Sequence, residues 1–288
     1  MDKVIVTGGS GFIGSNLVDK LNRSGYEVVV IDNFSTGDPG NLPHIFGKVS
    51  SIDIDDWSLE KLTELCDGAK CIFHMAAFPS VQRSIEYPVI SSQDLSATVR
   101  MLEVAKRIKV NKFIFSSSCS VYGEPPASRP LSPYALSKLH GEDYCTMYSS
   151  LHNLNTVCLR YYNVYGPRMS KVGAYRSVLS IFLEAHNAGK PLNIVNDGEQ
   201  KREFVHVDDV VDANICAMNA KKSSSQNIFD ISYGKKYSVN EIADMFGGDK
   251  VYGETRIEPK EIKKSNIESA KCFLEWEPCV ELKDWIPL

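Results

Sequence analysis

The sequence contains no long apolar segment, no closely spaced cysteine pair and no large excess of charge of either sign. No apolar run approaches the ~18 residues of a membrane span, so we expect no association with a membrane. The eight cysteines include no CxxC pair, which excludes a zinc ribbon and favours reduced, mostly buried thiols. The net charge of −4 argues against broad binding to nucleic acid. Because no signal-peptide pattern precedes the first strand-like run, a cytoplasmic location is expected.

With 288 residues, of which 43% are hydrophobic, the chain can bury a large core. Its first half alternates short apolar runs, typical of strands buried on both faces, with longer segments of helical periodicity. The strand-like runs are 4–6, 28–31, 71–73, 113–115 and 157–159. The helical segments are 12–21, 96–108 and 135–151. This alternation predicts an α/β protein with a doubly wound parallel sheet of the Rossmann type.

The rhythm changes after about Gly166, where prolines and glycines separate shorter elements. Helices are predicted over 178–187, 209–219 and 238–246, and a strand over 204–207. We therefore expect a Rossmann domain over 1–165, to which 204–220 returns, and a smaller C-terminal α/β lobe over 166–288. Trp276 and Trp285 are expected in the core of that lobe.

A glycine-rich turn, TGGSGFIG, follows the first strand-like run. In such a turn Gly8 permits the tight bend, Gly11 lets the backbone approach a pyrophosphate, and Gly14 lets the helix pack on the strand. Asp32 ends the next strand, at the spacing of a carboxylate that binds the adenosine ribose. Because this carboxylate would repel a 2′-phosphate and no Arg adjoins it, NAD is favoured over NADP. The structural alternative is that Asp32 begins a turn with Asn33.

Tyr134 and Lys138 stand four residues apart at the start of a predicted helix, so they project from one face. A tyrosine with a pKa of ~10 is a poor base at neutral pH. A nearby ammonium group and the positive nicotinamide ring both favour the phenolate, so we expect Lys138 and the cofactor together to lower the pKa of Tyr134. A run of serines, 116–118, ends the preceding strand, and ligands of doubly wound sheets bind at the carboxyl ends of strands.

Together these motifs resemble the extended short-chain dehydrogenase/reductase family, and within it the nucleotide-sugar 4-epimerases. The resemblance covers almost the whole chain. It is carried by TGGSGFIG (7–14), HMAA (74–77), FSSSCSVYG (115–123), SPYALSKLHGE (132–142), LRYYNVYGPR (159–168) and EFVHVDDVVDA (203–213). It implies an isomerase of the UDP-glucose 4-epimerase type with tightly bound NAD, whose C-terminal lobe binds the substrate. UDP-glucose and UDP-galactose are the implied substrates, with the N-acetylated forms as further candidates.

The resemblance also implies roles for single residues. Tyr134 is the general base and acid, Ser118 hydrogen-bonds the sugar 4-hydroxyl, and Lys138 holds the nicotinamide ribose. The residues implied to bind NAD are Gly8, Gly11, Phe12, Ile13, Gly14, Asp32, Asn33, Ser35, Thr36, Asp53, Ile54, Met75, Ala76, Ala77, Tyr134, Lys138 and Tyr162. Those implied to bind the substrate are Ser118, Asn163, Arg202, Arg256 and Ser265. The resemblance implies no metal. It implies a homodimer that forms through helices near 91–109 and 134–152.

Within the substrate set, the resemblance gives two separate tasks. Asn163, Arg202 and Arg256 would hold the diphosphate, for which Arg is well suited. Ser265 would stand beside the C2 substituent of the sugar, where a small residue admits an N-acetyl group.

The sequence departs from the family pattern at three places. Asp94 stands where the family often has Asn, and the segment 122–134 is shorter than usual. Near the C-terminus, Glu258 occupies the slot in which an Arg is common, and Arg256 lies two residues earlier.

Two other functions remain open. A 4,6-dehydratase or decarboxylase of this family typically carries a carboxyl just after the active-site serine, whereas Cys119 and Ser120 follow Ser118 here. A non-catalytic NAD-binding relative usually lacks the Tyr or the Lys, and both are present. We expect Cys119 to be a packed thiol, His74 to pack or hydrogen-bond under the cofactor, and Asp208 to cap the following helix.

Overall fold

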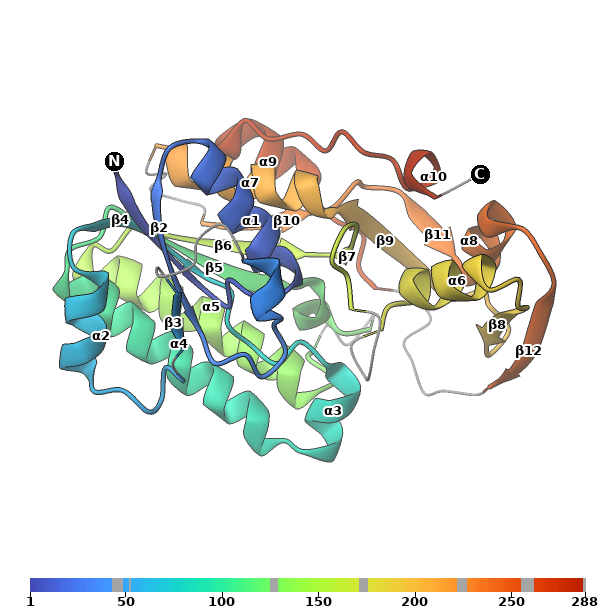
Figure 1. Ribbon diagram of the computed structural model, residues 1–288, viewed down its shortest axis with the longest axis horizontal. Coiled ribbons are helices and arrows are strands. Elements are labelled where there is room, and N and C mark those ends of the chain that lie inside the picture. The colour runs from blue at the N-terminus through green and yellow to red at the C-terminus, as the bar shows by residue number, and fades with distance from the viewer. Residues whose placement is uncertain are drawn as a thin grey trace.

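A parallel sheet of seven strands lies at the centre of the computed structural model, which describes residues 1–42, 49–51, 53–124, 129–170, 176–221, 227–254 and 262–286. The order across the sheet is β10-β6-β5-β4-β1-β2-β3, and neighbouring strands are parallel (Figure 1). The strands are β1 (Lys3–Thr7), β2 (Glu27–Asp32), β3 (Val49–Ser51), β4 (Ala69–His74), β5 (Lys112–Ser118), β6 (Thr156–Tyr161) and β10 (Ile228–Ile231). The winding reverses between β1 and β4, and ligands of such sheets bind where the winding reverses.

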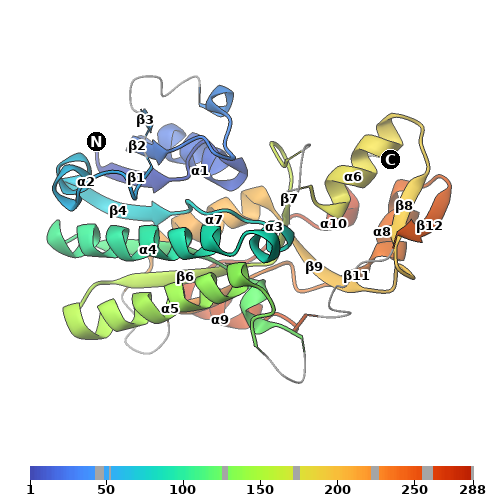
Figure 2. The ribbon, with the colours of Figure 1, turned by 90° about the horizontal axis from the view of Figure 1, so that it is seen from below.

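Helices cover both faces of this sheet. One face carries α1 (Phe12–Arg23), α7 (Val207–Asn219) and α9 (Ile267–Leu274). The other carries α2 (Leu59–Cys66), α4 (Val89–Arg107) and α5 (Pro133–His152), and Figure 2 shows α4 and α5 side by side. A short helix, α3 (Val81–Glu86), precedes α4. The doubly wound α/β fold predicted from the sequence is therefore confirmed.

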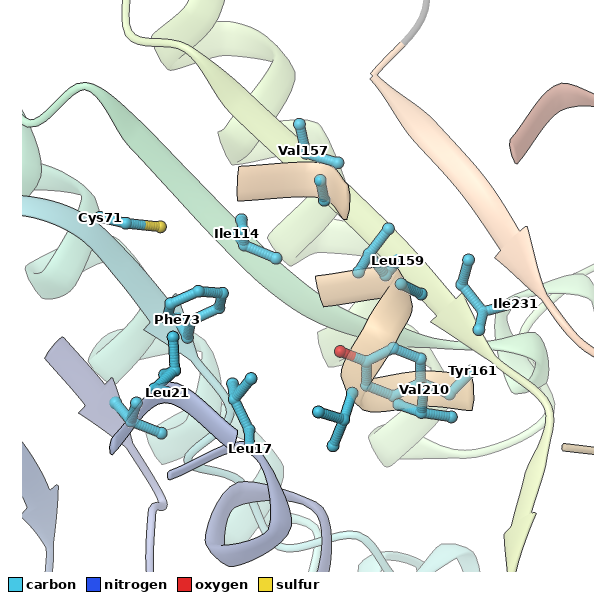
Figure 3. Close-up of a cluster of buried hydrophobic side chains, with 14 of the residues drawn as sticks. Leu17, Leu21, Cys71, Phe73, Ile114, Val157, Leu159, Tyr161, Val210 and Ile231 are labelled. Atoms are coloured by element: carbon cyan, nitrogen blue, oxygen red, sulfur yellow. The ribbon is translucent and has the colours of Figure 1, made fainter. Parts of the chain in front are cut away.

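Two apolar cores lie on the two faces, because successive strand residues point to opposite sides. In β1, Val4 and Val6 pack under α1 and α7, whereas Ile5 between them packs under α4. All three side chains are fully buried. Figure 3 shows the first core, in which Leu17 of α1 and Val210 of α7 lie over the strands β4, β5 and β6. The apolar runs of the sequence are thus strands buried on both faces, as predicted.

A smaller lobe lies to the right of the sheet in Figure 1. Its strands form a sheet of order β11-β9-β7 and a parallel pair, β12 and β8. They are β7 (Asn163–Tyr165), β8 (Leu192–Val195), β9 (Lys201–His206), β11 (Lys236–Ser238) and β12 (Lys250–Glu254). Around them pack α6 (Val178–Asn187), α8 (Val239–Phe246) and α10 (Leu282–Trp285). Two 3₁₀ turns, η1 (Pro39–Asn41) and η3 (Cys119–Tyr122), follow β2 and β5.

The predicted division of the chain at residue 166 is wrong for several segments. β10 pairs with β6 in the main sheet, and α9 packs on β10 and α7. The returning segment 204–220 is split, because α7 packs on α1 whereas β9 belongs to the sheet of the lobe. Trp276 also lies in the core under α1 and α7, not in the lobe, while Trp285 packs in the lobe as expected. These segments join the sheet through contacts between distant parts of the chain, which local patterns do not encode.

All eight cysteines lie within the described residues and are free thiols, five of them buried, as the sequence predicted. Across the described residues, no helix is both long and apolar enough to cross a bilayer. Among the residues that the structure describes, no three His, Cys, Asp or Glu side chains lie close enough together to hold a metal ion.

Candidate active site

The carboxyl ends of β1 and β4 are joined by the buried hydroxyl of Thr7. Its Oγ1 accepts the N–H groups of Met75 and Ala76, each at 3.1 Å, and lies 2.8 Å from His74 Nδ1. Since Oγ1 already accepts two protons, its own proton goes to Nδ1, and His74 Nε2 then donates to Thr98 Oγ1 at 3.0 Å. Burial lowers the pKa of His74 to about 3, so the ring is neutral. The packed, hydrogen-bonded position predicted for His74 is confirmed.

The glycine-rich turn starts at this joint and needs glycine for steric reasons. Gly8 has a φ of 68°, and a Cβ there would lie 2.8 Å from the Ala76 nitrogen. A Cβ at Gly14 would lie 2.1 Å from the Gly8 carbonyl oxygen, so α1 packs on the turn only without a side chain. At Gly11, the N-cap of α1, the nearest described atom to an added Cβ is the Gly8 oxygen at 3.3 Å. This contact is tight but far less severe than the one at Gly14, and the cavity reaches the first turn of α1, whose N–H groups can bind an anion.

Asp32, buried at the end of β2, braces the same turn. Its Oδ2 accepts the Ser10 N–H at 2.8 Å, and its Oδ1 accepts the Phe34 N–H at 2.8 Å. The bond from Ser10 ties β2 to the glycine-rich turn. The bond from Phe34 closes a turn that begins at Asp32, which is the structural alternative considered for this residue in the sequence. Asn33 extends the arrangement by donating to Asp53 Oδ2 at 2.9 Å. The carboxylate therefore lies where a ribose would meet the turn.

A cavity of about 410 Å³ brings the predicted residues together. Its lining includes every residue implied to bind NAD and the three implied catalytic side chains. These are Gly8, Gly11, Phe12, Ile13, Gly14, Asp32, Asn33, Ser35, Thr36, Asp53, Ile54, Met75, Ala76, Ala77, Ser118, Tyr134, Lys138 and Tyr162. A glycine-rich turn at a helix N-terminus, with a carboxylate at the end of the next strand, fits a dinucleotide when both line one cavity.

Ser118, Tyr134 and Lys138 meet in this cavity although they come from two elements. Ser118 is the last residue of β5, and its hydroxyl acts to lower the pKa of Tyr134. Tyr134 and Lys138 project from the first turns of α5, which Ser132 caps by accepting the Ala135 N–H at 3.1 Å. The Lys138 Nζ donates to the Ser116 carbonyl at 2.9 Å and lies 5.9 Å from the centre of the Tyr134 ring.

The protein's own groups act on the pKa of Tyr134 in opposite directions. Burial raises the pKa of Tyr134, and the hydrogen bond from Ser118 offsets this only in part. Burial also lowers the pKa of Lys138, whose ammonium is directed at Ser116 and not at the phenol oxygen. Desolvation therefore outweighs the neighbouring cation within the described residues.

Behind the serine run, a buried polar network holds β5 and β6 in register. Glu142, only 1% exposed, accepts the Ser117 hydroxyl and two N–H groups of Arg160, at 2.8 and 2.5 Å. The Arg160 guanidinium lies 4.6 Å from the ring centre of Tyr122, whose hydroxyl donates to Asp230 Oδ1 at 2.7 Å. Such paired buried charges stabilise little on balance but fix orientation.

Of the residues predicted to bind the substrate, Ser118 lines the cavity, and the others do not or lie outside the described residues. Asn163 and Arg202 do not line the cavity, and the Asn163 side chain donates to the Glu203 carbonyl at 2.8 Å. Arg202 donates to the Lys201 carbonyl at 2.9 Å. Arg256 lies outside the described residues, as does 125–128 of the short segment 122–134.

Ser265 is held by a buried carboxylate at the edge of the lobe. Its Oγ donates to Glu203 Oε2 at 2.5 Å, and its N–H donates to Glu203 Oε1 at 3.0 Å. Ser232 donates to the same Oε2 at 2.6 Å. Nearby, the Tyr162 hydroxyl donates to the Lys263 carbonyl at 3.0 Å, which ties the segment before α9 to the cavity wall.

Residues 4–232, most of the chain, match the NAD dependent epimerase/dehydratase family. The chain belongs to this family. It is 35% identical over 311 residues to a UDP-glucose 4-epimerase of Mycolicibacterium smegmatis, covering 99% of this chain and 96% of that protein. Its fold is similar to UDP-glucose 4-epimerase of Thermotoga maritima with UDP-glucose, with a TM-score of 0.91, 33% identity, and coverage of 99% and 96%. UDP-N-acetylglucosamine 4-epimerase of Methanobrevibacter ruminantium is also similar, with a TM-score of 0.89, 30% identity and the same coverage.

Two expectations about this family member can be judged from the structure. Cys119 is a buried thiol whose pKa burial raises to about 12, as expected of a packed side chain. The expectation that Asp208 caps α7 is wrong. His206 is the N-cap, because its Nδ1 accepts the Asp208 N–H at 3.2 Å.

Several lining residues of this epimerase/dehydratase family member were not predicted. They are Ile31, Asp55, Phe78, Pro79, Ile90, Gln93, Asp94, Ala97, Ser116, Ser117, Tyr161, Val164, Met169, Ser170 and Ser177. The serine run signalled Ser116 and Ser117, and Asp94 stood out as a departure from the family pattern. Tyr161 and Val164 lie within the LRYYNVYGPR segment, although no role was predicted for them. The others lie outside the quoted motifs and reach the cavity only through the tertiary fold.

Two glycine substitutions separate cofactor binding from folding. Gly11→Ala adds a methyl group 3.3 Å from the Gly8 carbonyl oxygen, a contact that a shift of a few tenths of an ångström relieves, so we expect a nearly native unfolding curve and weaker NAD binding. An overpacking term of ~1–3 kcal/mol corresponds to a roughly ten- to hundred-fold loss of affinity. Gly14→Ala forces α1 off the turn and should lower the free energy of unfolding as well. Calorimetric NAD titration and denaturant unfolding measure the two effects, and equal unfolding losses in both variants would contradict the assignment of Gly11.

Proposed function

We propose that this protein is an NAD-dependent UDP-hexose 4-epimerase, which interconverts UDP-glucose and UDP-galactose through a transient 4-keto sugar. The observation that carries the proposal is the meeting of Ser118, Tyr134 and Lys138 in one cavity with the glycine-rich turn and Asp32. The similarity of the whole chain to UDP-sugar 4-epimerases supports the same reaction.

The chain's own side chains would handle the proton. Tyr134 takes the proton of the sugar 4-hydroxyl, and Ser118 holds the oxygen that loses it. Bound NAD would accept the C4 hydride, and its positive charge would favour the tyrosine phenolate. Tyr134 returns the proton after the keto sugar has turned its other face. Lys138 would hold the ribose that places this chemistry beside the phenol.

A positive charge is needed because burial alone disfavours the phenolate. Burial raises the pKa of Tyr134, and each unit of pKa corresponds to ~1.4 kcal/mol of differential stabilisation. The Ser118 hydroxyl provides part of the compensation from the protein itself. Tyr134 would therefore become an effective base only when a positively charged cofactor lies in the cavity.

Other positions in the cavity and the lobe would bind the rest of the ligands. Asn163 and Arg202 lie on neighbouring strands of the lobe, β7 and β9, and would hold the diphosphate together with Arg256. Phe12 and Ile13 would line the pyrophosphate turn, with Asp32 on the adenosine ribose. We place the sugar beside Ser118, between the main sheet and the lobe.

The alternative reactions of the family meet a specific obstacle. A dehydratase or decarboxylase would use a carboxyl next to Ser118, and this place is taken by the buried thiol of Cys119. A non-catalytic NAD-binding protein would have no need to keep Ser118, Tyr134 and Lys138 together, and all three line the cavity. Both observations favour the epimerase.

The direct test uses the purified protein without added cofactor. Because the hydride leaves and returns, NAD need not exchange, and UDP-glucose and UDP-galactose should interconvert as the protein is isolated. Product sugars are separated by chromatography, and the nucleotide released on denaturation is identified. Isolation with NADP, or no conversion of any UDP-hexose with NAD present, would contradict the proposal.

Substitutions of the three central residues should have distinct effects. Tyr134→Phe removes only the phenol oxygen, so turnover should be abolished, a loss of at least ~10²–10⁴-fold, with NAD affinity nearly unchanged. Lys138→Ala should lose both activity and part of the NAD affinity, and Ser118→Ala should slow turnover without unfolding the protein. Tyr87→Phe, at an exposed tyrosine, is the matched control. Full activity of Tyr134→Phe would remove this residue from the mechanism.

The substrate range can be tested at Ser265. If its small side chain leaves room beside the sugar C2 position, the enzyme also converts UDP-N-acetylglucosamine, and Ser265→Tyr should lower that rate more than the rate on UDP-glucose. Ser265→Ala is the control, because it loses the hydroxyl bond to Glu203 but keeps the N–H bond and the space. Equal losses on both sugars in the Tyr variant would show a disturbed lobe and exclude Ser265 as the selective residue.

We also propose a homodimer through α4 and α5. Leu136, Met147 and Leu151 share one face of α5 by helical spacing, and all three are exposed, Leu151 by 69%. An apolar helix face of this kind is typical of an interface. Light scattering should give twice the chain mass, and Leu151→Lys should shift the protein towards the monomer. A monomer mass for the unaltered protein would contradict this part of the proposal.

A further inference from the structure

The loop after β2 returns to the glycine-rich turn and meets it at Ser10. Ser10 is fully buried within the segment TGGSGFIG. Its N–H donates to Asp32 Oδ2 at 2.8 Å, at the start of the loop. Its carbonyl oxygen accepts two bonds from the end of the loop, from the Asp38 N–H at 3.1 Å and from Asn41 Nδ2 at 2.9 Å. One residue of the turn therefore holds both ends of the loop.

A further contact between the loop and the turn, at Gly37, is steric. A Cβ at Gly37 would lie 1.9 Å from Ser10 Oγ and 2.9 Å from the Ser10 carbonyl carbon. Atoms that are not bonded to each other do not approach so closely, so any residue other than glycine would push the loop off the turn. The loop backbone thus lies directly against Ser10, between the two sets of hydrogen bonds.

Beyond this contact, the chain is anchored in the core. Asn41 is the last residue of η1, which Asp38 caps by accepting the Gly40 N–H at 2.8 Å. The next residue, Leu42, is 3% exposed and packs in the core under α1. Asn41 is therefore presented to Ser10 from a turn that is fixed at both ends, so its side chain has little freedom to lose when it forms the bond.

The part of the loop between these anchors lines the cavity. Asn33, Ser35 and Thr36 lie on the cavity wall and are exposed, so packing in a core does not hold them. The Ser35 N–H donates to Asn33 Oδ1 at 3.0 Å, and the contacts with Ser10 tie the whole segment to the glycine-rich turn. A dinucleotide places its pyrophosphate on such a turn and its adenosine ribose at the end of the second strand. Movement of the loop away from the turn would therefore open the adenosine end of the cavity.

We propose that Asn41 and Gly37 form a latch that holds the loop after β2 on the glycine-rich turn and so determines how slowly NAD leaves the protein. Neither residue is among the described residues that line the cavity, so both are positioning residues that act through Ser10. Slow release serves the proposed function, because a cofactor that takes up the hydride has to stay bound to return it. The latch itself depends on NAD binding and not on which sugar is converted.

The first test measures the release of NAD from the protein as isolated. Bound NAD is exchanged against an excess of isotopically labelled NAD, and the bound fraction is analysed by mass spectrometry at successive times. Loss of one hydrogen bond between neutral groups should make Asn41→Ala release NAD roughly two- to ten-fold faster. Gly37→Ala displaces the loop further and should release NAD at least as fast as Asn41→Ala. Unchanged release in either variant would overturn the proposal.

A double variant shows whether the two residues act together. If they form one latch, Gly37→Ala already breaks the Asn41 bond, so the double variant should release NAD no faster than Gly37→Ala alone. Effects that multiply would show two independent contacts and overturn the latch. The matched controls are Asn187→Ala, which removes an exposed amide on α6, and Gly253→Ala on β12, where an added Cβ meets no described atom within 4 Å. Both controls should release NAD at the rate of the unaltered protein.

Hydrogen exchange separates the latch from a general loss of structure. In Asn41→Ala, exchange followed by mass spectrometry should become faster in 33–41, while α1 and β2 keep the rates of the unaltered protein. Faster exchange throughout the protein would indicate a structural role for Asn41 and overturn the proposal. A protein that converts no UDP-sugar would contradict the proposed function, while the release and exchange measurements would still decide the role of the latch.

Discussion

The buried hydroxyl of Thr7 is the interaction on which the site depends. It joins the end of β1 to the first residues after β4, where the winding of the sheet reverses. The glycine-rich turn begins on one side of Thr7, and the segment that forms one wall of the cavity begins on the other. The ring of His74 hydrogen-bonds both Thr7 and Thr98, and so connects this point to α4. A misplacement of about 1 Å can lower an enzymatic rate by roughly a hundredfold. A rigid joint at this point therefore determines whether the two halves of the cavity match.

Buried charges around the cavity orient the surrounding elements more than they stabilise the fold. Asp32 fixes the glycine-rich turn, Glu142 fixes the serine strand through Ser117, and Glu203 fixes the lobe through Ser265. Each carboxylate has several hydrogen-bond donors, so its burial leaves little polar capacity unsatisfied. Replacing such groups with apolar ones is often neutral for stability, which leaves orientation as their main contribution.

The acid–base pair shows how burial and charge oppose each other. Desolvation favours the neutral forms of both Tyr134 and Lys138. The Ser118 hydroxyl favours the phenolate, whereas the Asp94 carboxylate favours the phenol and the ammonium. The protonation of the pair is thus a balance among groups from β5, α4 and α5. This balance is a property of the assembled cavity and of no single element.

The sequence by itself determined the features that rest on local physics. Apolar runs of the right length are strands buried on both faces. The spacing of Gly8, Gly11 and Gly14 predicted the turn, because a side chain at any of them would come too close to atoms of the neighbouring backbone. Only the tertiary structure decided that β10 joins the main sheet and that Trp276 packs in the core on one of its faces. It also decided that His206 and not Asp208 caps α7, and that Ser265 is bound to Glu203. It also decided the direction in which the pKa of Tyr134 moves. These outcomes depend on contacts between distant parts of the chain and on the exclusion of water, and neither leaves a periodic pattern in the sequence.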